Sequence, residues 1–96
     1  PFRGQTAKRA ARIELAIRAW ARRDPAVRHV VDESDASRTS YIAQIFSGMG
    51  FSASEARHRA VMAYSMNVAC SQLTVAGGVW KQDELMKFAE GLLASR

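Results

Sequence analysis

Three observations predict that this 96-residue sequence has an all-α fold, an antiparallel arrangement of four helices. Apolar side chains recur every three or four residues, which is the spacing of one helical face. The only prolines are Pro1 and Pro25, so long stretches contain no helix breaker. No run of alternating apolar residues bounded by turn residues indicates a strand. A chain of this length forms one small domain with a limited core.

The first helix is expected from about residue 7 to residue 23. Three apolar residues stand on one face of it, at i, i+4 and i+7: Ile13, Ile17 and Trp20. Asp24 and Pro25 separate it from the next helix, because proline disfavours helical conformation in the residue before it. Proline also suits the first position of a new helix, which Asp24 can cap. Arg22 and Arg23 are expected in the last turn, where cations suit the negative end of the helix dipole.

The second helix is expected to run from Pro25 to about Ser47. It begins with valines and closes with a group of aromatic and aliphatic residues around Phe46. Its polar middle, residues 32–40, is either exposed to solvent or a bend. Gly48 and Gly50 can supply the left-handed conformation that ends a helix.

A capping box predicts the start of the third helix, expected over Ala53–Val75. Ser52 and Glu55 are spaced so that each side chain can satisfy the other's backbone N–H, and Phe51 can act as a hydrophobic staple. Beyond its charged first turns this helix is apolar nearly all round, which is typical of a helix buried on more than one side. Gly77-Gly78 is expected to end it.

The fourth helix is expected over about Gln82–Ala94, and with the third it offers an apolar, self-complementary surface. The candidate interface residues come from both helices: Met62, Met66, Ala69, Leu73, Leu85, Phe88, Ala89 and Leu92. Two such helix pairs about a two-fold axis would form a four-helix bundle. The alternative is that these residues form only an intramolecular core. We favour a homodimer, because so short a chain has little material to cover them.

Another face of the third helix carries Tyr64, Asn67 and Ser71 at i, i+3 and i+7. With Trp20 and Phe46 from other helices, these residues are candidates to line a mostly apolar cavity with a few directing hydrogen-bond groups. In the alternative interpretation, Tyr64 and Asn67 bond the neighbouring backbone and enclose nothing.

The net charge of +5 is concentrated at one end of the sequence. The first 28 residues hold eight basic and two acidic residues, whereas the remainder holds six basic and seven acidic residues. A basic end can attract nucleic acid non-specifically, with an affinity that falls steeply as salt rises. The other interpretation is a solvated helix face, which the lack of interleaved aromatic residues favours.

The sequence contains no catalytic or metal-binding pattern, so an enzyme is not expected, and neither is a cofactor. His29 and His58 stand on different helices, and a single cysteine cannot build a zinc site. Cys70 and His58 are about 18 Å apart along one helix, too far for a nucleophile pair. Cys70 is expected to be a small buried residue. One cysteine, no signal peptide and no membrane-length apolar run favour a cytoplasmic protein.

Two segments, "ELAIRAWARRDPAV" and "YIAQIFSGMGFSASEARHRAVMAYSM", followed by a final amphipathic helix, closely resemble the C-terminal regulatory domain of TetR-family transcriptional repressors. The resemblance covers roughly Arg12 to Leu93. It implies an all-helical bacterial-type regulator that dimerises through its last two helices. It also implies an internal cavity for a small, often apolar effector, whose binding alters DNA binding. The candidate cavity residues come from the helical pattern alone.

The sequence departs from this family because the residues before Arg12 do not resemble its DNA-binding helix-turn-helix domain. Pro1 could be a true start or the first residue of a fragment, and the sequence favours a fragment of a longer repressor. The main alternative function is a stand-alone helical dimerisation or protein-interaction module that binds no small molecule.

Overall fold

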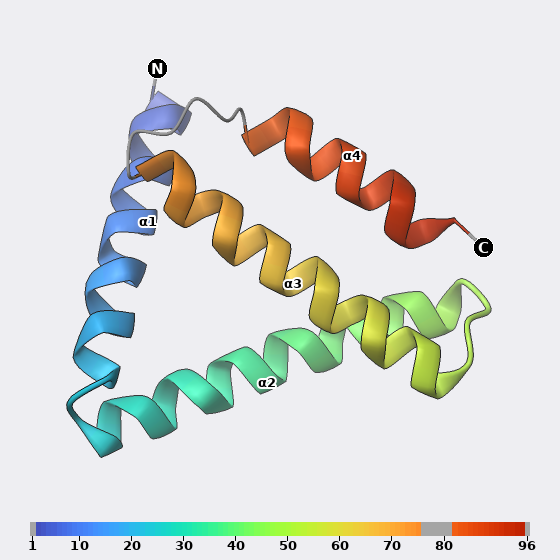
Figure 1. Cartoon of the computed structure of the whole chain (residues 1–96), viewed down its shortest axis with the longest axis horizontal. Coiled ribbons are helices and arrows are strands. Elements are labelled where there is room, and N and C mark those ends of the chain that lie inside the picture. Colours follow the sequence, from blue (N-terminus) through green and yellow to red (C-terminus); the bar gives the residue numbers. More distant parts are fainter. Residues whose placement is uncertain (1, 76–81, 96) are drawn as a thin grey trace.

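The computed structural model describes residues 2–75 and 82–95, and these residues fold into four α-helices without strands. The helices are α1 (Phe2–Ala21), α2 (Pro25–Gly48), α3 (Ala53–Val75) and α4 (Gln82–Ala94), as Figure 1 shows. The all-α prediction is therefore confirmed for the described part of the chain. The expected stop at Gly77-Gly78 lies outside the described residues. Of these four helices, none is both long and apolar enough to cross a membrane.

The helices α1, α2 and α3 form the sides of a triangle, and α4 runs antiparallel to α3 along its outer side (Figure 1). The first two helices meet at a corner instead of lying antiparallel. α3 packs against each of the other three helices. This agrees with a third helix that is apolar on more than one side. The molecule is flat, with extents of 36 × 34 × 20 Å.

The residues that the sequence predicts form the corner between α1 and α2, with one correction. The Asp24 carboxylate caps α2 by accepting from the backbone N–H groups of Ala26 (3.0 Å) and Val27 (3.4 Å). Arg22 and Arg23 were expected inside the last turn of α1 but follow its end. Their N–H groups donate to carbonyls three residues earlier, a tightened turn that ends the helix.

The turn between α2 and α3 is built on Gly50, whose φ of 101° is the left-handed conformation expected there. Half of the predicted capping box is present, since the Ser52 hydroxyl accepts from the Glu55 N–H at 3.2 Å. The Glu55 carboxylate instead accepts from the Arg59 guanidinium at 3.0 Å, one helical turn ahead.

The hydrophobic core lies where the end of α2, the start of α3 and the end of α4 meet. Its buried members are Phe46, Phe51, Ala56, Ala60 and Leu93. The rings of Phe46 and Phe51 meet edge to face, with centroids 5.9 Å apart. Ala56 and Ala60 are fully buried and let the neighbouring helices approach α3 closely.

Arg59 joins the end of α4 and Ser95 to this core. Its guanidinium lies 4.1 Å from the centre of the Phe51 ring, a cation–π contact. It also donates to the backbone carbonyls of Leu93 and Ser95 at the end of α4. A cation at these carbonyls complements the negative end of the helix dipole.

The face of α1 that packs against the other helices differs from the expected one. Its packed residues are Ala11 and Ala21, which are buried, and Glu14 and Arg18, which are half-buried. The face predicted from Ile13, Ile17 and Trp20 is largely exposed instead, with 49% of Trp20 accessible. Both faces have helical spacing, and polar partners on α2 and α3 determine which one turns inward.

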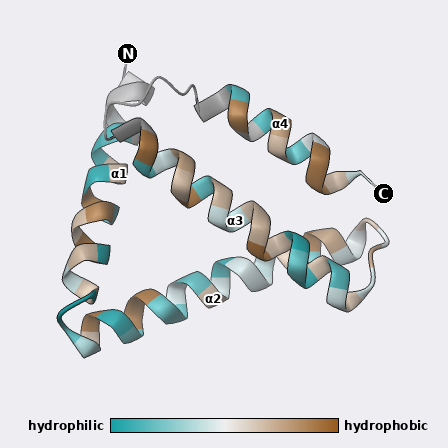
Figure 2. Cartoon of the chain, in the orientation of Figure 1, coloured by the Kyte–Doolittle hydropathy of each residue, from teal (hydrophilic) through white to brown (hydrophobic). Residues whose placement is uncertain are grey.

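The polar middle of α2 is neither a bend nor a wholly exposed stretch. The helix is continuous, and Asp35 and Thr39 lie half-buried on the same face as Val31 and Ile42. The Thr39 hydroxyl donates to the Asp35 carbonyl at 2.8 Å, within the helix. The packed face of α2 therefore passes through its polar segment, whose other side chains are exposed. Figure 2 shows the mainly hydrophilic colouring of the middle of α2.

Replacing Gly91 with alanine is expected to stabilise the protein by about 1 kcal/mol. A Cβ there meets no heavy atom within 4 Å, and glycine inside a helix costs about that much relative to alanine. The matched variant Gly50→Ala should destabilise by about 1 kcal/mol or more, because its φ is positive. Urea unfolding followed by circular dichroism measures both changes. A destabilising Gly91→Ala would contradict the open surroundings of that position.

Candidate ligand-binding site

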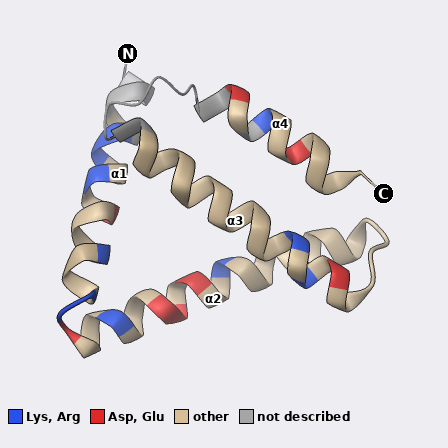
Figure 3. Ribbon diagram, in the orientation of Figure 1, with Lys and Arg blue, Asp and Glu red and all other residues tan. Residues whose placement is uncertain are grey.

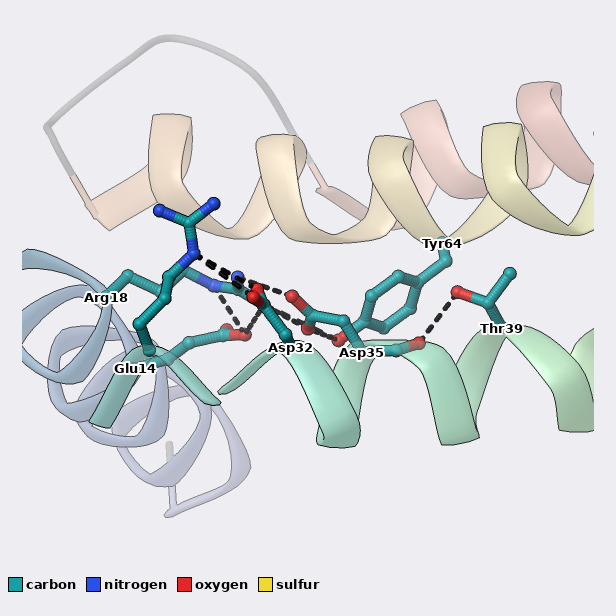
Figure 4. Close-up of polar contacts among 7 residues, drawn as sticks. Glu14, Arg18, Asp32, Asp35, Thr39 and Tyr64 are labelled. Atoms are coloured by element: carbon teal, nitrogen blue, oxygen red, sulfur yellow. Dashed lines mark hydrogen bonds and ion pairs between the residues drawn. The ribbon is translucent and has the colours of Figure 1, made fainter. Parts of the chain in front are cut away.

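A polar cluster joins α1, α2 and α3 inside the triangle (Figure 4). The Arg18 guanidinium of α1 binds both oxygens of Asp35 on α2, at 2.8 and 3.0 Å. The Tyr64 hydroxyl of α3 donates to the same carboxylate at 2.6 Å. Arg18 also donates to the Glu14 carboxylate, one turn earlier on α1, at 3.1 and 3.3 Å. Each helix of the triangle thus supplies at least one member.

The charges of this cluster stabilise one another. The hydrogen bonds from Arg18 hold the pKa of Asp35 below its usual value, with a further lowering by the Tyr64 hydroxyl. The hydrogen bond to Asp35, with that to Glu14, raises the pKa of Arg18. Burial raises the pKa of Tyr64, and donation to Asp35 raises it further. At neutral pH the cluster is therefore an ionised Arg–Asp pair held by a neutral tyrosine.

A cavity of about 550 Å³ lies beside this cluster, within the range typical of small-molecule sites. Its apolar lining comes from α1 and α2: Ala10, Ala11, Ile13, Ile17, Val30 and Val31. Its polar lining comes from all three helices: Glu14, Arg18, Ser34, Asp35, Arg38, Tyr64 and Ser71. Because Ile13 and Val30 are more than half exposed, the cavity is open to solvent.

Of the five candidate cavity residues, the structure brings two to this cavity. Tyr64 and Ser71 line it from α3. Asn67, between them, is exposed and outside the lining, and Trp20 is exposed on α1. Phe46 is buried in the core at the other end of α2. The Tyr64 hydroxyl bonds a side chain from another helix, not the neighbouring backbone.

Sequence reasoning missed Arg18 and Asp35, the centre of the cluster. They are 17 positions apart, on different helices, so no local spacing pairs them. A weak signal exists in the sequence, because Glu14 and Arg18 stand at i and i+4 between two alanines of the same face. Small residues on either side of a charge pair indicate a helix face that can pack closely against other helices.

The other charged and titratable residues that the structure describes do not form a second cluster of this kind. The remaining basic side chains of α1 and the corner that the structure describes are exposed: Lys8, Arg9, Arg12, Arg22 and Arg23. Figure 3 shows basic residues along α1 and at its corner with α2. His29 and His58 are exposed, and Cys70 is a buried free thiol. Within the described ranges, no group of His, Cys, Asp and Glu side chains is arranged to hold a metal ion.

The candidate interface residues on α3 and α4 divide into two groups. Exposed apolar side chains form one group: Met62, Ala69, Leu73, Phe88 and Leu92. Ala89 is only 2% exposed, and Met66 and Leu85 are half-buried. The buried position of Ala89 shows that part of the predicted surface packs within the chain.

Comparisons of the chain with protein-family models, with curated proteins and with solved structures found no match.

Replacing Asp35 with asparagine is expected to destabilise the protein by about 2 kcal/mol at pH 7, because hydrogen bonds to charged groups are worth this much. The Asp35 pKa is lowered on folding, so its stabilising effect is present above the unfolded pKa near 3.8 and is lost as pH falls through the folded value. The gap between variant and wild type should thus close in acid. Urea unfolding of both proteins from pH 7 down to pH 2 measures how this difference in stability changes.

The control for this prediction is Asp32→Asn on the same helix. Asp32 pairs with Arg28 at 3.2 Å, but both side chains are more than half exposed, so a loss of less than about 1 kcal/mol is expected. Equal losses in the two variants would show that the Arg18–Asp35 pair contributes no more than a surface pair.

Replacing Tyr64 with phenylalanine is expected to cost about 1 kcal/mol, the net value of one hydrogen bond. Tyr41, 66% exposed on α2, provides the control Tyr41→Phe, for which little change is expected. The Tyr64 pKa is raised on folding, so its stabilising effect is present below the unfolded pKa near 10 and is lost as pH rises through the folded value. Unfolding curves of both variants at alkaline pH test this loss of stability. A Tyr64→Phe variant as stable as wild type would exclude a stabilising hydrogen bond from Tyr64.

Proposed function

We propose that this chain is the effector-sensing and dimerisation domain of a TetR-like transcriptional repressor. The observation that carries the proposal is the open cavity between three helices, lined by an apolar wall and a polar cluster. Its volume suits a small molecule, and the few directed polar groups suit selective recognition. DNA would be bound by a helix-turn-helix domain that is not among these residues.

The exposed area of the chain supports dimerisation. The isolated chain exposes 7312 Å², whereas a compact monomer of this mass, 10.6 kDa, exposes about 5,500 Å². The difference of roughly 1,800 Å² exceeds the ~800 Å² that each partner buries in a standard protein interface. A second copy packed on the flat molecule would cover such an excess.

The apolar pattern of α4 indicates where the second copy would lie. Ala89 and Leu93, at i and i+4, pack against the chain's own helices and are buried. Phe88 and Leu92, displaced by one residue, remain 69% and 59% exposed. A helix that packs only within its own chain would need only the first pair, Ala89 and Leu93, to be apolar. We infer that the second pair, with Met62 and Leu73 of α3, contacts the partner in a four-helix bundle.

The same helix, α3, adjoins both proposed sites, and this favours a coupling between them. Tyr64 and Ser71 line the cavity, and Met62 and Leu73 are exposed on the proposed interface. A ligand that binds two arrangements of α3 unequally shifts the population toward one of them. In the repressor that shift would change the spacing of the two DNA-binding domains.

Replacing Leu92 with glutamate is expected to convert a dimer into a monomer that keeps its helices, because a charge in an apolar interface is strongly unfavourable. Leu15→Glu on α1 is the matched control, since Leu15 is 46% exposed and does not line the cavity. Sedimentation-equilibrium masses and circular dichroism measure both variants. A wild type that is monomeric at micromolar concentration would contradict the dimer proposal.

A reporter assay tests dimerisation and sensing together. The chain would be fused to a DNA-binding domain that represses transcription only as a dimer, and small apolar compounds would then be screened for relief of repression. Repression that Leu92→Glu abolishes and that a cavity ligand changes is expected. Repression insensitive to any compound that binds the cavity would instead favour the interaction module without an effector.

A further inference from the structure

The cavity contains a positive charge that the protein does not neutralise by contact. Arg38, an exposed residue, lines it from α2, and within the described part of the chain no hydrogen bond or ion pair engages its guanidinium, which acts on Asp35 only through space. Arg18 differs, because all three of its side-chain nitrogens donate to Glu14 or Asp35. A ligand covering Arg38 would remove a charge from water, which is costly unless the ligand supplies an acceptor.

The acidic side chains of the cavity do not favour a positively charged ligand. Both oxygens of Asp35 accept hydrogen bonds from Arg18, and one also accepts from Tyr64. Glu14 accepts hydrogen bonds from two nitrogens of the same arginine, so both acids of the cavity already have a donor. A cationic ligand would compete with Arg18 for these carboxylates and would bring a like charge near Arg38.

The apolar lining of α2 and the Arg38 side chain stand at opposite ends of this part of the helix, which limits the ligand's shape. Val30 and Val31 line the cavity near the start of the helix, Ser34 and the Arg18-bound Asp35 one turn later, and Arg38 one turn beyond Ser34. Seven residues of helix from Val31 to Arg38 span about 10 Å. A ligand that uses both ends therefore has an apolar body of about this length and a charged group at one end.

We propose that the cavity binds an amphipathic monocarboxylate, with its carboxylate on Arg38 and its apolar body against the valines of α2 and the isoleucines of α1. This inference rests on the proposed function, whose effector it assigns to a chemical class. One arginine matches one negative charge in planar, bidentate geometry. A phosphate dianion would bring a second negative charge close to Glu14 and Asp35, which disfavours it.

The test compares three probes that share one alkyl chain and differ in the head group: decanoate, decan-1-ol and decylamine. Isothermal titration calorimetry at pH 7, below the micelle concentrations of the two ions and the solubility limit of the alcohol, measures their binding to the whole chain. Decanoate should bind about tenfold more tightly than decan-1-ol, the effect of a charge-assisted contact of ~1.4 kcal/mol. Decylamine should bind most weakly.

Two matched variants test whether Arg38 is the side chain that binds the carboxylate. Arg38→Gln should reduce decanoate affinity about tenfold, to that of the alcohol, and leave decan-1-ol binding unchanged. Arg57→Gln makes the same charge change on α3 at an exposed residue outside the cavity, and both probes should bind it as they bind wild type. Equal binding of decanoate and decan-1-ol by wild type, or an unaffected Arg38→Gln, would overturn the proposal, as would a preference for decylamine.

Failure of this inference and failure of the proposed function give different results. If the three probes bind equally, the cavity is a binding site without acid selectivity, and only the carboxylate proposal is wrong. If decanoate binds through Arg38 but leaves reporter repression unchanged, the carboxylate site stands and the sensing function is wrong. If none of the probes binds, the carboxylate proposal is overturned, and the reporter assay decides separately on dimerisation.

Discussion

The bidentate contact between Arg18 and Asp35 is the interaction on which the arrangement of the first three helices depends. The buried residues of α1 that the structure describes are only Ala11 and Ala21, so little apolar burial holds this helix in place. Instead, Arg18 crosses to α2, and Tyr64 joins the same carboxylate from α3. Because alanines face inward beside a long charged side chain, the triangle is not filled, and the cavity is a direct result of how α1 is attached.

The molecule therefore has two centres of different physical character. At the end formed by α2, α3 and α4, aromatic rings, fully buried alanines and Leu93 make a close-packed core. At the other end, directional polar contacts hold helices around open space. A packed core resists small displacements, whereas the polar cluster leaves space beside it that a ligand can enter. A binding site that must respond to its ligand is better placed at the second centre, where the cavity lies.

The difference between local and tertiary information explains what the sequence could predict. Helix boundaries follow from neighbouring residues, as at the Asp24 cap, the Gly50 turn and Ser52, and all three were predictable. The inward face of α1 was not. Periodicity allows either the stripe of Ile13 or that of Arg18, and the choice depends on Asp35 and Tyr64, which come much later in the chain. Hydrophobicity alone therefore missed the packed face of α1 and gave the exposed Trp20 as a cavity residue, although Ile13 and Ile17 of the predicted face do line the cavity.

The position of Tyr64 on α3 gives the proposed regulation a physical route. Its hydroxyl reaches Asp35 only while α3 keeps its present rotation, and the exposed Met62 lies two residues away, on a different side of the same helix. A carboxylate bound to Arg38 would weaken the favourable charge interaction of Arg38 with Asp35, so that the ionised acid would depend more on its hydrogen-bond donors, Arg18 and Tyr64. The bound ligand would then stabilise the arrangement in which α3 is held against α1 and α2. In the proposed dimer, any other rotation of α3 would cost the energy of those hydrogen bonds, and this difference is the source of coupling between the two sites.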